Sequence, residues 1–270
     1  AVTKVLRSSK VNSWTGDEVK SFENEFSSKI GINHSIAIAN GSLALSSCYL
    51  ASDLHAGDEV ITTPRTFIAT SSSLMLLKIK PIFADVDVDS GCITADTIEP
   101  LINKKTKAIV VVHLGGWPAE MEKITKLASN YNLKLIEDCA QAHGAKIKGK
   151  SVGTFGDMAA WSFCTDKIMS TGGEGGMVTT NNNLLWESVW SLKDHGQSYN
   201  AVFKRNHRPG FKWLHEGFGS NFRLTEMQAA IGRIQLNKLD EWNSIRSMNA
   251  MILINELNKL SILNIPLPPN

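Results

Sequence analysis

Short runs of apolar, often β-branched residues alternate along the chain with longer segments whose apolar residues recur at helical spacing. The runs are SIAIA (35–39), EVIT (59–62), PIFADV (81–86), AIVVVH (108–113) and KLIED (134–138). Between them lie SLALSSCYLASDL, TFIATSSSLMLLKI and EMEKITKLASNYN. Continuous apolar strands that alternate with helices are typical of a parallel sheet covered on both faces. The predicted class is therefore α/β, with the ligand in the crevice beyond the carboxyl ends of the strands.

After Ser151 the pattern changes to short, glycine-punctuated strands, MAAWSF and GMVTT, followed by a helix that begins near Asn183. A polar, aromatic loop is expected over 195–220, and a long helix from Leu224 to about Leu260. Apolar residues lie on more than one face of that helix, which predicts that part of its surface needs a covering partner. The residues concerned are Ile231, Ile234, Leu236, Leu239, Met251, Ile252, Leu253 and Leu257.

Charge and cysteine content narrow the class of ligand. The 270 residues are 43% hydrophobic, enough for a sizeable core. The chain contains 28 Lys and Arg residues and 26 Asp and Glu residues. A net charge of +2 gives no electrostatic case for nucleic acid or an anionic membrane, so a small ligand is expected. Four scattered cysteines without a CxxC pair indicate reduced thiols, a cytoplasmic location and no metal site. The N-terminus has no signal-like apolar region, and no run is long enough to span a bilayer.

The stretch WSFCTDKIMSTGGEGGMVTT (161–180) has the strongest features of a site. It places one lysine, Lys167, between a short apolar run and four glycines crowded around a glutamate. Glycines at this density cost backbone entropy unless something must approach the main chain closely. The lysine fits either a phosphate cradle, as a point charge, or a carbonyl-capturing site, as a nucleophilic amine. A P-loop nucleotide site is not expected, because no GxxxxGK[ST] motif is present.

Two further segments favour a phosphate site. The first strand ends in Asn-Gly-Ser (40–42), where the next helix begins, and free N–H groups at a helix start attract phosphate. Ser42 adds a hydroxyl, although a simple helix cap explains the same residues. Ser162, five residues before Lys167, is either a second phosphate contact or an ordinary strand serine.

Other candidates suit a planar ring. Asp138 ends a buried strand, where it either caps the next turn or pairs with a protonated pyridine nitrogen. Gln141 follows at a distance suited to a ring hydroxyl, and the role of His143 is left open. Phe67, after the second strand, either joins the core or stacks on a planar ring. An anion site, an acid and a lysine that all follow strands are the parts of a site for pyridoxal 5′-phosphate (PLP).

The motifs NGSLAL, GDEVITTPRTFIAT, PIFADVD, VVHLGG, EDCAQAHGAKIKGKSVGTFGD, SFCTDK, GGEGGMVTTN, KDHG and SNFRLTEMQAAIGRIQLNKLDEW resemble, in order, those of the DegT/DnrJ/EryC1/StrS family of nucleotide-sugar aminotransferases. EDCAQAHG followed by SFCTDK and GGEGG is the most specific part, and the resemblance spans nearly the whole chain. It implies the large domain of a fold-type I PLP-dependent transferase, with a mainly parallel seven-stranded sheet between helices. It also implies a homodimer with a shared active site.

By position, the resemblance assigns the cofactor contacts. Lys167 matches the Schiff-base lysine, Asp138 the partner of the pyridine nitrogen, Gln141 the contact to the ring hydroxyl and Phe67 the stacking aromatic residue. The phosphate-binding positions are Gly41, Ser42 and Ser162, with Asn221 reaching the phosphate from the neighbouring subunit. A sister branch has histidine in place of the lysine and dehydrates sugars, so Lys167 favours transamination.

The resemblance also implies how the chain divides. Residues 1–223 are expected to form the PLP-binding large domain with an N-terminal segment. Residues 224–270 are expected to form a long helix and the proline-rich connector NIPLPPN, the start of a smaller C-terminal domain that is mostly absent. In this interpretation the chain is a truncated or naturally short form that keeps its cofactor chemistry but closes poorly over its sugar, so turnover suffers most.

The expected reaction is transfer of an amino group from glutamate to C3 or C4 of a nucleotide-linked keto deoxysugar. Cell-surface polysaccharides, including lipopolysaccharide O-antigen, are the expected destination of such an amino sugar. The alternatives are a PLP-dependent sugar dehydratase or a PLP-binding protein without turnover. A nicotinamide-dependent oxidoreductase is disfavoured because no GxGxxG follows the first strand. The sugar, the carbon and the nucleotide stay open.

Overall fold

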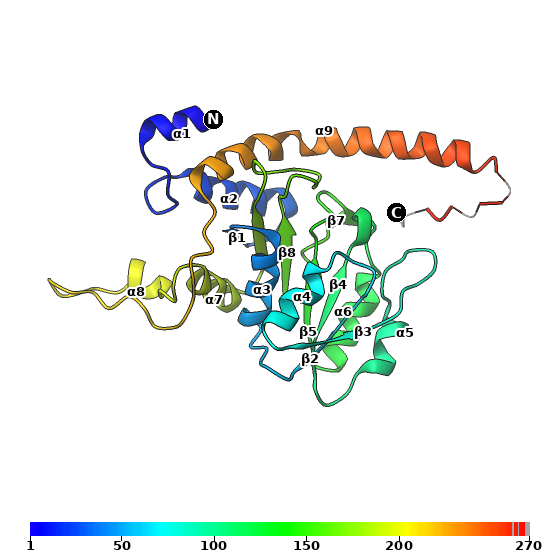
Figure 1. Cartoon of the computed structure of the whole chain (residues 1–270), viewed down its shortest axis with the longest axis horizontal. Coiled ribbons are helices and arrows are strands. Elements are labelled where there is room, and N and C mark those ends of the chain that lie inside the picture. Colours follow the sequence, from blue (N-terminus) through cyan, green and yellow to red (C-terminus); the bar gives the residue numbers. More distant parts are fainter. Residues whose placement is uncertain (261, 264, 268–270) are drawn as a thin grey trace.

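A seven-stranded sheet forms the centre of the molecule (Figure 1). The structure is a computed structural model and describes residues 1–260, 262–263 and 265–267. The strand order is β1-β9-β8-β5-β4-β2-β3. The strands are β1 (His34–Ile38), β2 (Glu59–Thr62), β3 (Lys80–Phe83), β4 (Thr106–Val112), β5 (Lys134–Asp138), β8 (Met158–Ser162) and β9 (Gly176–Thr180). Only β9 runs antiparallel to its neighbours, which confirms the predicted α/β class and the mainly parallel seven-stranded sheet.

Helices cover both faces of this sheet. One face packs against α3 (Gly41–Ala51), α4 (Ala69–Leu76) and α7 (Asn183–Lys193). The other packs against α2 (Glu18–Ile30) and α9 (Glu226–Leu257), and against α5 (Ala95–Ile98) and α6 (Met121–Asn130). Neighbouring strand residues such as Val110 and Val111 belong to the cores on opposite faces, as the alternation of side chains in a strand requires. Other elements are α1 (Val2–Ser8), the short 3-10 helices η1 (Glu99–Leu101) and η2 (Leu114–Gly116), and a small hairpin of β6 (Lys146–Ile147) and β7 (Lys150–Ser151).

The predicted loop over 195–220 contains a short helix, α8 (Tyr199–Phe203), that the sequence analysis did not anticipate. Ser198 caps it, with its hydroxyl accepting the Ala201 N–H at 3.2 Å. Tyr199 then packs against Trp186 of α7, with ring centroids 4.8 Å apart. Packing of aromatic side chains therefore stabilises a helix too short to form from propensity alone.

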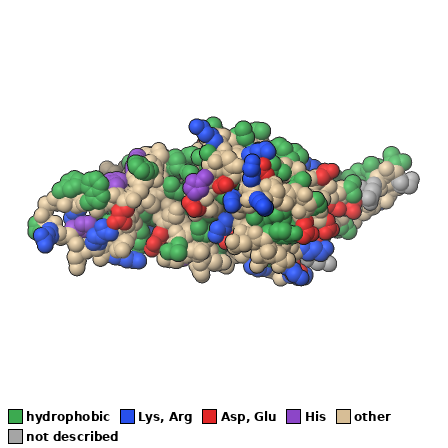
Figure 2. Space-filling model, turned by 90° about the horizontal axis from the view of Figure 1, so that it is seen from below, with side chains coloured by type: hydrophobic (Ala, Val, Ile, Leu, Met, Phe, Trp, Pro, Cys, Tyr) green, Lys and Arg blue, Asp and Glu red, His purple; other side chains and the backbone are tan. Residues whose placement is uncertain are grey.

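The rest of that loop projects away from the body of the molecule as an arm (Figure 1). Phe211 and Trp213 on the arm are 87% and 67% exposed. Figure 2 shows hydrophobic and basic side chains gathered at this end of the molecule. The arm thus presents apolar surface that its own chain does not cover.

The first part of the long helix α9 packs against the core, and the rest of it is largely exposed. Leu236 and Leu239 join the core that contains Phe22 and Phe26 of α2, whereas apolar residues further along α9 are exposed. These are Ile245, Met248, Met251, Ile252, Leu253 and Leu257, and Ile234 is also exposed. The need for a covering partner stays a prediction, and the connector NIPLPPN lies partly outside the described residues. Among those that are described, no helix is long and apolar enough to cross a membrane.

Candidate active site

A cavity of about 590 Å³ opens at the carboxyl ends of β4, β5 and β8 and beside the turn that follows β1. This is the position expected for the ligand of a parallel sheet. The cavity brings together residues that the sequence analysis selected from four separate segments. They are Gly41, Ser42, Phe67, Asp138, Gln141, Ser162 and Lys167. Asn221 is exposed and does not line the cavity of its own chain.

The phosphate side of the cavity is the N-terminus of α3. Asn40 caps this helix, with its side-chain oxygen accepting the Leu43 N–H at 2.9 Å. A Cβ built on Gly41 would lie 2.6 Å from the Ser162 Cβ, so the helix start lies directly against the end of β8. The first turn of α3 therefore points its remaining N–H groups at a position bordered by two serine hydroxyls, an arrangement that suits an anion.

Gly41→Ala is expected to weaken cofactor binding and to lower the free energy of unfolding by about 1–3 kcal/mol, the typical cost of overpacking. The added methyl group would push the start of α3 away from Ser162. Cofactor titration and urea unfolding would measure the two effects. Gly217→Ala is the matched control, because a Cβ there meets nothing closer than 3.9 Å. A Gly41→Ala protein that resembles the control in both measurements would contradict the close packing.

The ring side of the cavity is set by Asp138 at the end of β5. Its carboxylate accepts the Thr70 hydroxyl at 2.8 Å and the Ala140 N–H at 3.1 Å, and the residue is only 5% exposed. Burial raises the pKa of Asp138, although these hydrogen bonds oppose the shift. No described residue forms an ion pair with it. A buried carboxylate without a cationic partner fits a ligand that brings its own positive charge, such as a protonated pyridine nitrogen.

Lys167 approaches the same cavity from the loop after β8. Its side chain is 13% exposed, and its Nζ bonds the carboxylate of Asp166 at 2.9 Å. The Nζ also lies 6.0 Å from the centre of the Phe67 ring, which is 65% exposed just before α4. An amine, an aromatic face and a buried acid thus border one space.

Gln141 and the glycine-rich segment around Lys167 form the remaining borders of the cavity. The Gln141 side-chain oxygen accepts the Gly115 N–H at 2.7 Å, which leaves its amide N–H groups free to donate into the cavity. Gly172 and Gly173 have φ angles of 86° and 119°, which favour glycine. A Cβ on Gly176 would lie 2.5 Å from the Asn40 carbonyl oxygen. The glycines around Lys167 therefore turn the chain and let β9 pack against the phosphate side of the site.

Sequence reasoning missed a buried network directly behind Asp138. Glu137 and His113 are fully buried, with 3.0 Å between Oε2 and Nε2. Glu137 also accepts N–H groups of Gly153, Phe155 and Gly156, each at 2.8 Å, and His113 Nδ1 accepts the Ala119 N–H. His113 therefore donates from Nε2. With Cys139 these residues come within metal-ligand reach, but their nitrogen and oxygen atoms already bond one another and the backbone.

Burial alone would raise the pKa of Glu137, but the hydrogen bonds from His113 and the backbone outweigh it and lower the pKa below its ordinary 4.5. The ionised carboxylate thus stabilises the fold above that pH, and the contribution is lost as pH falls through the lowered value.

Glu137→Gln is expected to reduce the free energy of unfolding by about 2–3 kcal/mol at pH 7, the range for hydrogen bonds to a charged group. The difference from the unaltered protein should shrink as the pH falls through the lowered pKa of Glu137. Urea unfolding across the acid range would measure both. Glu122→Gln, at a residue whose side chain is 62% exposed, is the control. A difference in the free energy of unfolding that stays constant with pH would contradict an ionised Glu137 in this network.

His143, whose role the sequence left open, packs against the rings of Trp161 and Phe163 and does not line the cavity. Burial lowers its pKa to about 3, so it is neutral at physiological pH. Its position is that of a core residue. Thr70, in contrast, donates a hydrogen bond directly to Asp138, a role that the sequence analysis did not assign to it although it ends the motif GDEVITTPRTFIAT.

Known proteins are similar to this chain in sequence and in fold. The model of the DegT/DnrJ/EryC1/StrS aminotransferase family matches residues 1–270. GDP-perosamine synthase of Escherichia coli O157:H7 is 39% identical over 245 residues, covering 91% of this chain and 64% of that protein. An aminotransferase from Psychrobacter cryohalolentis has a solved structure with a TM-score of 0.97 and 52% identity, covering 98% of this chain and 68% of that one.

A GDP-4-keto-6-deoxymannose-3-dehydratase, solved with a trapped PLP-glutamate geminal diamine, has a TM-score of 0.90 at 26% identity. The match covers 100% of this chain and 72% of that one. The chain spans between 53% and 65% of the length of the curated relatives compared with it. The family is PLP-dependent, as the sequence predicted. With the fold, the cavity and the family model in agreement, the chain belongs to the DegT/DnrJ/EryC1/StrS aminotransferase family.

Proposed function

We propose that the protein is a PLP-dependent aminotransferase that moves an amino group from glutamate to the C3 or C4 keto carbon of a nucleotide-linked deoxysugar. The observation that carries this proposal is the single cavity bordered by the Lys167 amine, the Asp138 carboxylate and the Phe67 ring. Relatives named for GDP-perosamine synthesis and for a dTDP-3-amino-3,6-dideoxygalactose transaminase support the substrate class. The division at residues 1–223 and 224–270 and the cytoplasmic location are parts of the same proposal.

The residues of this chain divide the work between binding and proton transfer. Bound PLP would supply an electron sink for the carbanion formed at the amino-bearing carbon. The N-terminus of α3, Ser42 and Ser162 would hold the phosphate, and Asp138 would keep the proton on the pyridine nitrogen. Lys167 Nζ would take a proton from the donor carbon and return one to the acceptor carbon, as general base and acid. Phe67 would hold the ring plane.

The test is amino transfer from ¹⁵N-glutamate to a panel of dTDP-, UDP- and GDP-linked keto sugars, followed by mass spectrometry. A ¹⁵N-labelled amino sugar is the expected product. A product that lacks an oxygen and gains no nitrogen would instead support the dehydratase alternative. The observation that favours this alternative is the similarity in fold to GDP-4-keto-6-deoxymannose-3-dehydratase. Cofactor absorbance without any product would support a PLP-binding protein without turnover.

The shared-site homodimer is also proposed, and Asn221 provides its test. Asn221 lies outside the cavity of its own chain, in a segment that follows the projecting arm. Asn221→Ala is expected to weaken cofactor affinity about tenfold, the loss of one hydrogen bond to a charged group. At a PLP concentration too low to fill the Asn221→Ala sites, a mixture of Lys167→Ala and Asn221→Ala chains should recover activity, because each mixed dimer contains one intact site.

Sedimentation would establish the dimer, and Asn237→Ala, at an exposed residue of α9, is the matched control. A monomer at micromolar concentration, or a mixture no more active than its two components, would rule out the shared site.

A further inference from the structure

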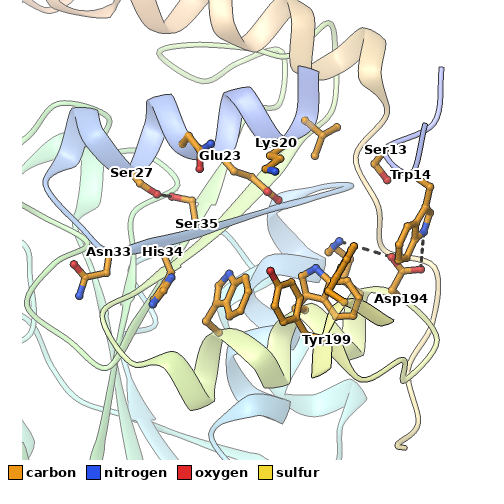
Figure 3. A pocket seen from close by; sticks show the side chains of 16 residues that line it. Ser13, Trp14, Lys20, Glu23, Ser27, Asn33, His34, Ser35, Asp194 and Tyr199 are labelled. Atoms are coloured by element: carbon orange, nitrogen blue, oxygen red, sulfur yellow. Dashed lines mark hydrogen bonds and ion pairs between the residues drawn. The ribbon is translucent and has the colours of Figure 1, made fainter. Parts of the chain in front are cut away.

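A second cavity, of about 340 Å³, lies beside the edge strand β1 and shares no lining residue with the active-site cavity. Its walls come from the N-terminal loop, α2, the start of β1, α7 and α8, segments far apart in the sequence. Figure 3 shows α2 along one side and the segment that carries Tyr199 along the other. The volume lies at the lower end of the range for small-molecule sites.

One wall of this cavity is aromatic. The Tyr199 ring centre lies 4.8 Å from that of Trp186, 5.2 Å from that of Trp190 and 4.9 Å from that of Phe203. Trp14, from the N-terminal loop, stacks on Phe203 at 6.2 Å. Trp14 and Phe203 remain 42% and 58% exposed, so their ring surface is not used up by the core. The wall therefore offers an apolar surface to a ligand.

The opposite wall carries the Glu23 carboxylate. Glu23 points from α2 toward the cavity (Figure 3), and its Oε1 accepts the Ala37 N–H of β1 at 2.8 Å. No described residue forms an ion pair with it. Burial raises the pKa of Glu23, and the nearby charge of Lys193 offsets this only in part. The second carboxylate oxygen is thus an acceptor available to a cationic donor.

Lys193 supplies the complementary charge. Its Nζ lies 5.3 Å from the Trp190 ring centre and 3.8 Å from the Asp194 carboxylate, which is longer than a hydrogen bond. Asp194 is already bonded to Arg223 and to the Trp14 indole N–H. The buried ammonium of Lys193 therefore has room for a further anionic acceptor.

The charges around the cavity favour a ligand without net charge. The carboxylates of Glu23 and Asp194 balance the cations of Lys193 and Arg223, and Lys20 at the rim is exposed. A nucleotide or another multiply charged ion would upset this balance. A zwitterion with an apolar body matches all three features, namely a free carboxylate oxygen, an incompletely bonded ammonium and an aromatic wall.

We propose that this cavity is a binding site for a free amino acid with an apolar or aromatic side chain. The ligand's ammonium group bonds Glu23, its carboxylate bonds Lys193, and its side chain packs against the aromatic wall, where Trp14 and Phe203 leave ring surface exposed. The site is separate from the one that holds the cofactor and the amino donor.

Isothermal titration calorimetry of the cofactor-loaded protein with L-phenylalanine tests the proposal. Borohydride reduction beforehand prevents the amine from reacting with the cofactor. L-Phenylalaninamide lacks the carboxylate and N-acetyl-L-phenylalanine lacks the ammonium, so each is expected to bind at least about tenfold more weakly, the usual effect of losing a hydrogen bond to a charged group. No binding of L-phenylalanine at millimolar concentration, or equal binding of all three probes, would overturn the proposal.

Variants locate the binding. Glu23→Gln and Lys193→Met are each expected to weaken L-phenylalanine binding at least about tenfold. Glu122→Gln and Lys148→Met, which alter an exposed ion pair elsewhere, should leave it unchanged. Unchanged affinity in the Glu23 and Lys193 variants would mean that the amino acid binds elsewhere and that the aromatic cluster only anchors α8. If Lys193→Met fails to fold, the Glu23→Gln variant and the three probes still test whether the amino acid binds in this cavity.

Discussion

Replacement of Lys167 by arginine is expected to reduce amino transfer by at least about 10²–10⁴-fold, the contribution of a positioned general acid and base. The substitution keeps the positive charge, but a guanidinium stays protonated and cannot act as a nucleophilic amine. The side chain is 13% exposed, and among the described residues Lys167 is the one lysine that lines the cavity, so no other lysine amine there can take over the same proton transfer. The rate of ¹⁵N transfer from glutamate measures the loss.

Lys146→Arg is the matched control for this experiment, because Lys146 is an exposed lysine on the β6–β7 hairpin, away from the cavity. The control should retain normal turnover. A Lys167→Arg protein that still transfers nitrogen at a rate close to the control would remove Lys167 from the reaction.

Asp138→Asn is expected to lower turnover by about 10²–10³-fold, the size of losing one electrostatic stabiliser in an active site. Asparagine keeps the shape of the side chain and can still accept the Ala140 N–H, while its NH₂ group would donate to the Thr70 hydroxyl, but it cannot hold the proton on a pyridine nitrogen. The ultraviolet and visible spectrum of the bound cofactor should change as well, which separates this role from a purely structural one. Normal turnover with an unaltered spectrum would contradict the pairing.

The same substitution should stabilise the cofactor-free protein. Burial raises the pKa of Asp138 above its ordinary 3.8, so the unfolded chain releases this proton at a lower pH than the folded chain. Stability of the cofactor-free form therefore falls as pH rises from 3.8 through the raised pKa, and Asp138→Asn avoids this loss. The advantage of the variant should be absent in strong acid and full at neutral pH. A destabilised variant at pH 7 would show that the buried charge is compensated within the fold.

Much of the fold was predictable because the strands are continuous apolar runs and the helices repeat their apolar residues at helical spacing. Each of the seven predicted strands forms, and α9 begins at Glu226, close to the predicted Leu224. The capping box between Thr225 and Gln228 sets that boundary. Helix α8 was not predictable in the same way, because it depends on contacts between Tyr199 and rings on another helix.

The candidate active site likewise contains residues that could be predicted from the sequence and residues that could not. Residues at the carboxyl ends of strands, such as Asp138 and Ser162, could be placed because chain order and sheet geometry bring them together. Thr70, His113 and Glu137 lie within the quoted motifs, but the residue types alone do not show that Thr70 bonds Asp138 or that Glu137 pairs with His113, because these contacts follow from side-chain orientation. The cavity between α2 and α8 also depends on tertiary packing, and nothing in the local sequence of Glu23 or Lys193 marks it.

Peptide mapping of the borohydride-reduced, PLP-loaded protein tests whether Lys167 is the residue that carries the cofactor. Borohydride fixes the cofactor to the amine that holds it, and mass spectrometry of the digest identifies that residue. We expect a pyridoxyl group on Lys167, the lysine bordering the cavity with Asp138 and Phe67. A pyridoxyl group on Lys146, Lys148 or Lys150 instead, with Lys167 unmodified, would contradict it.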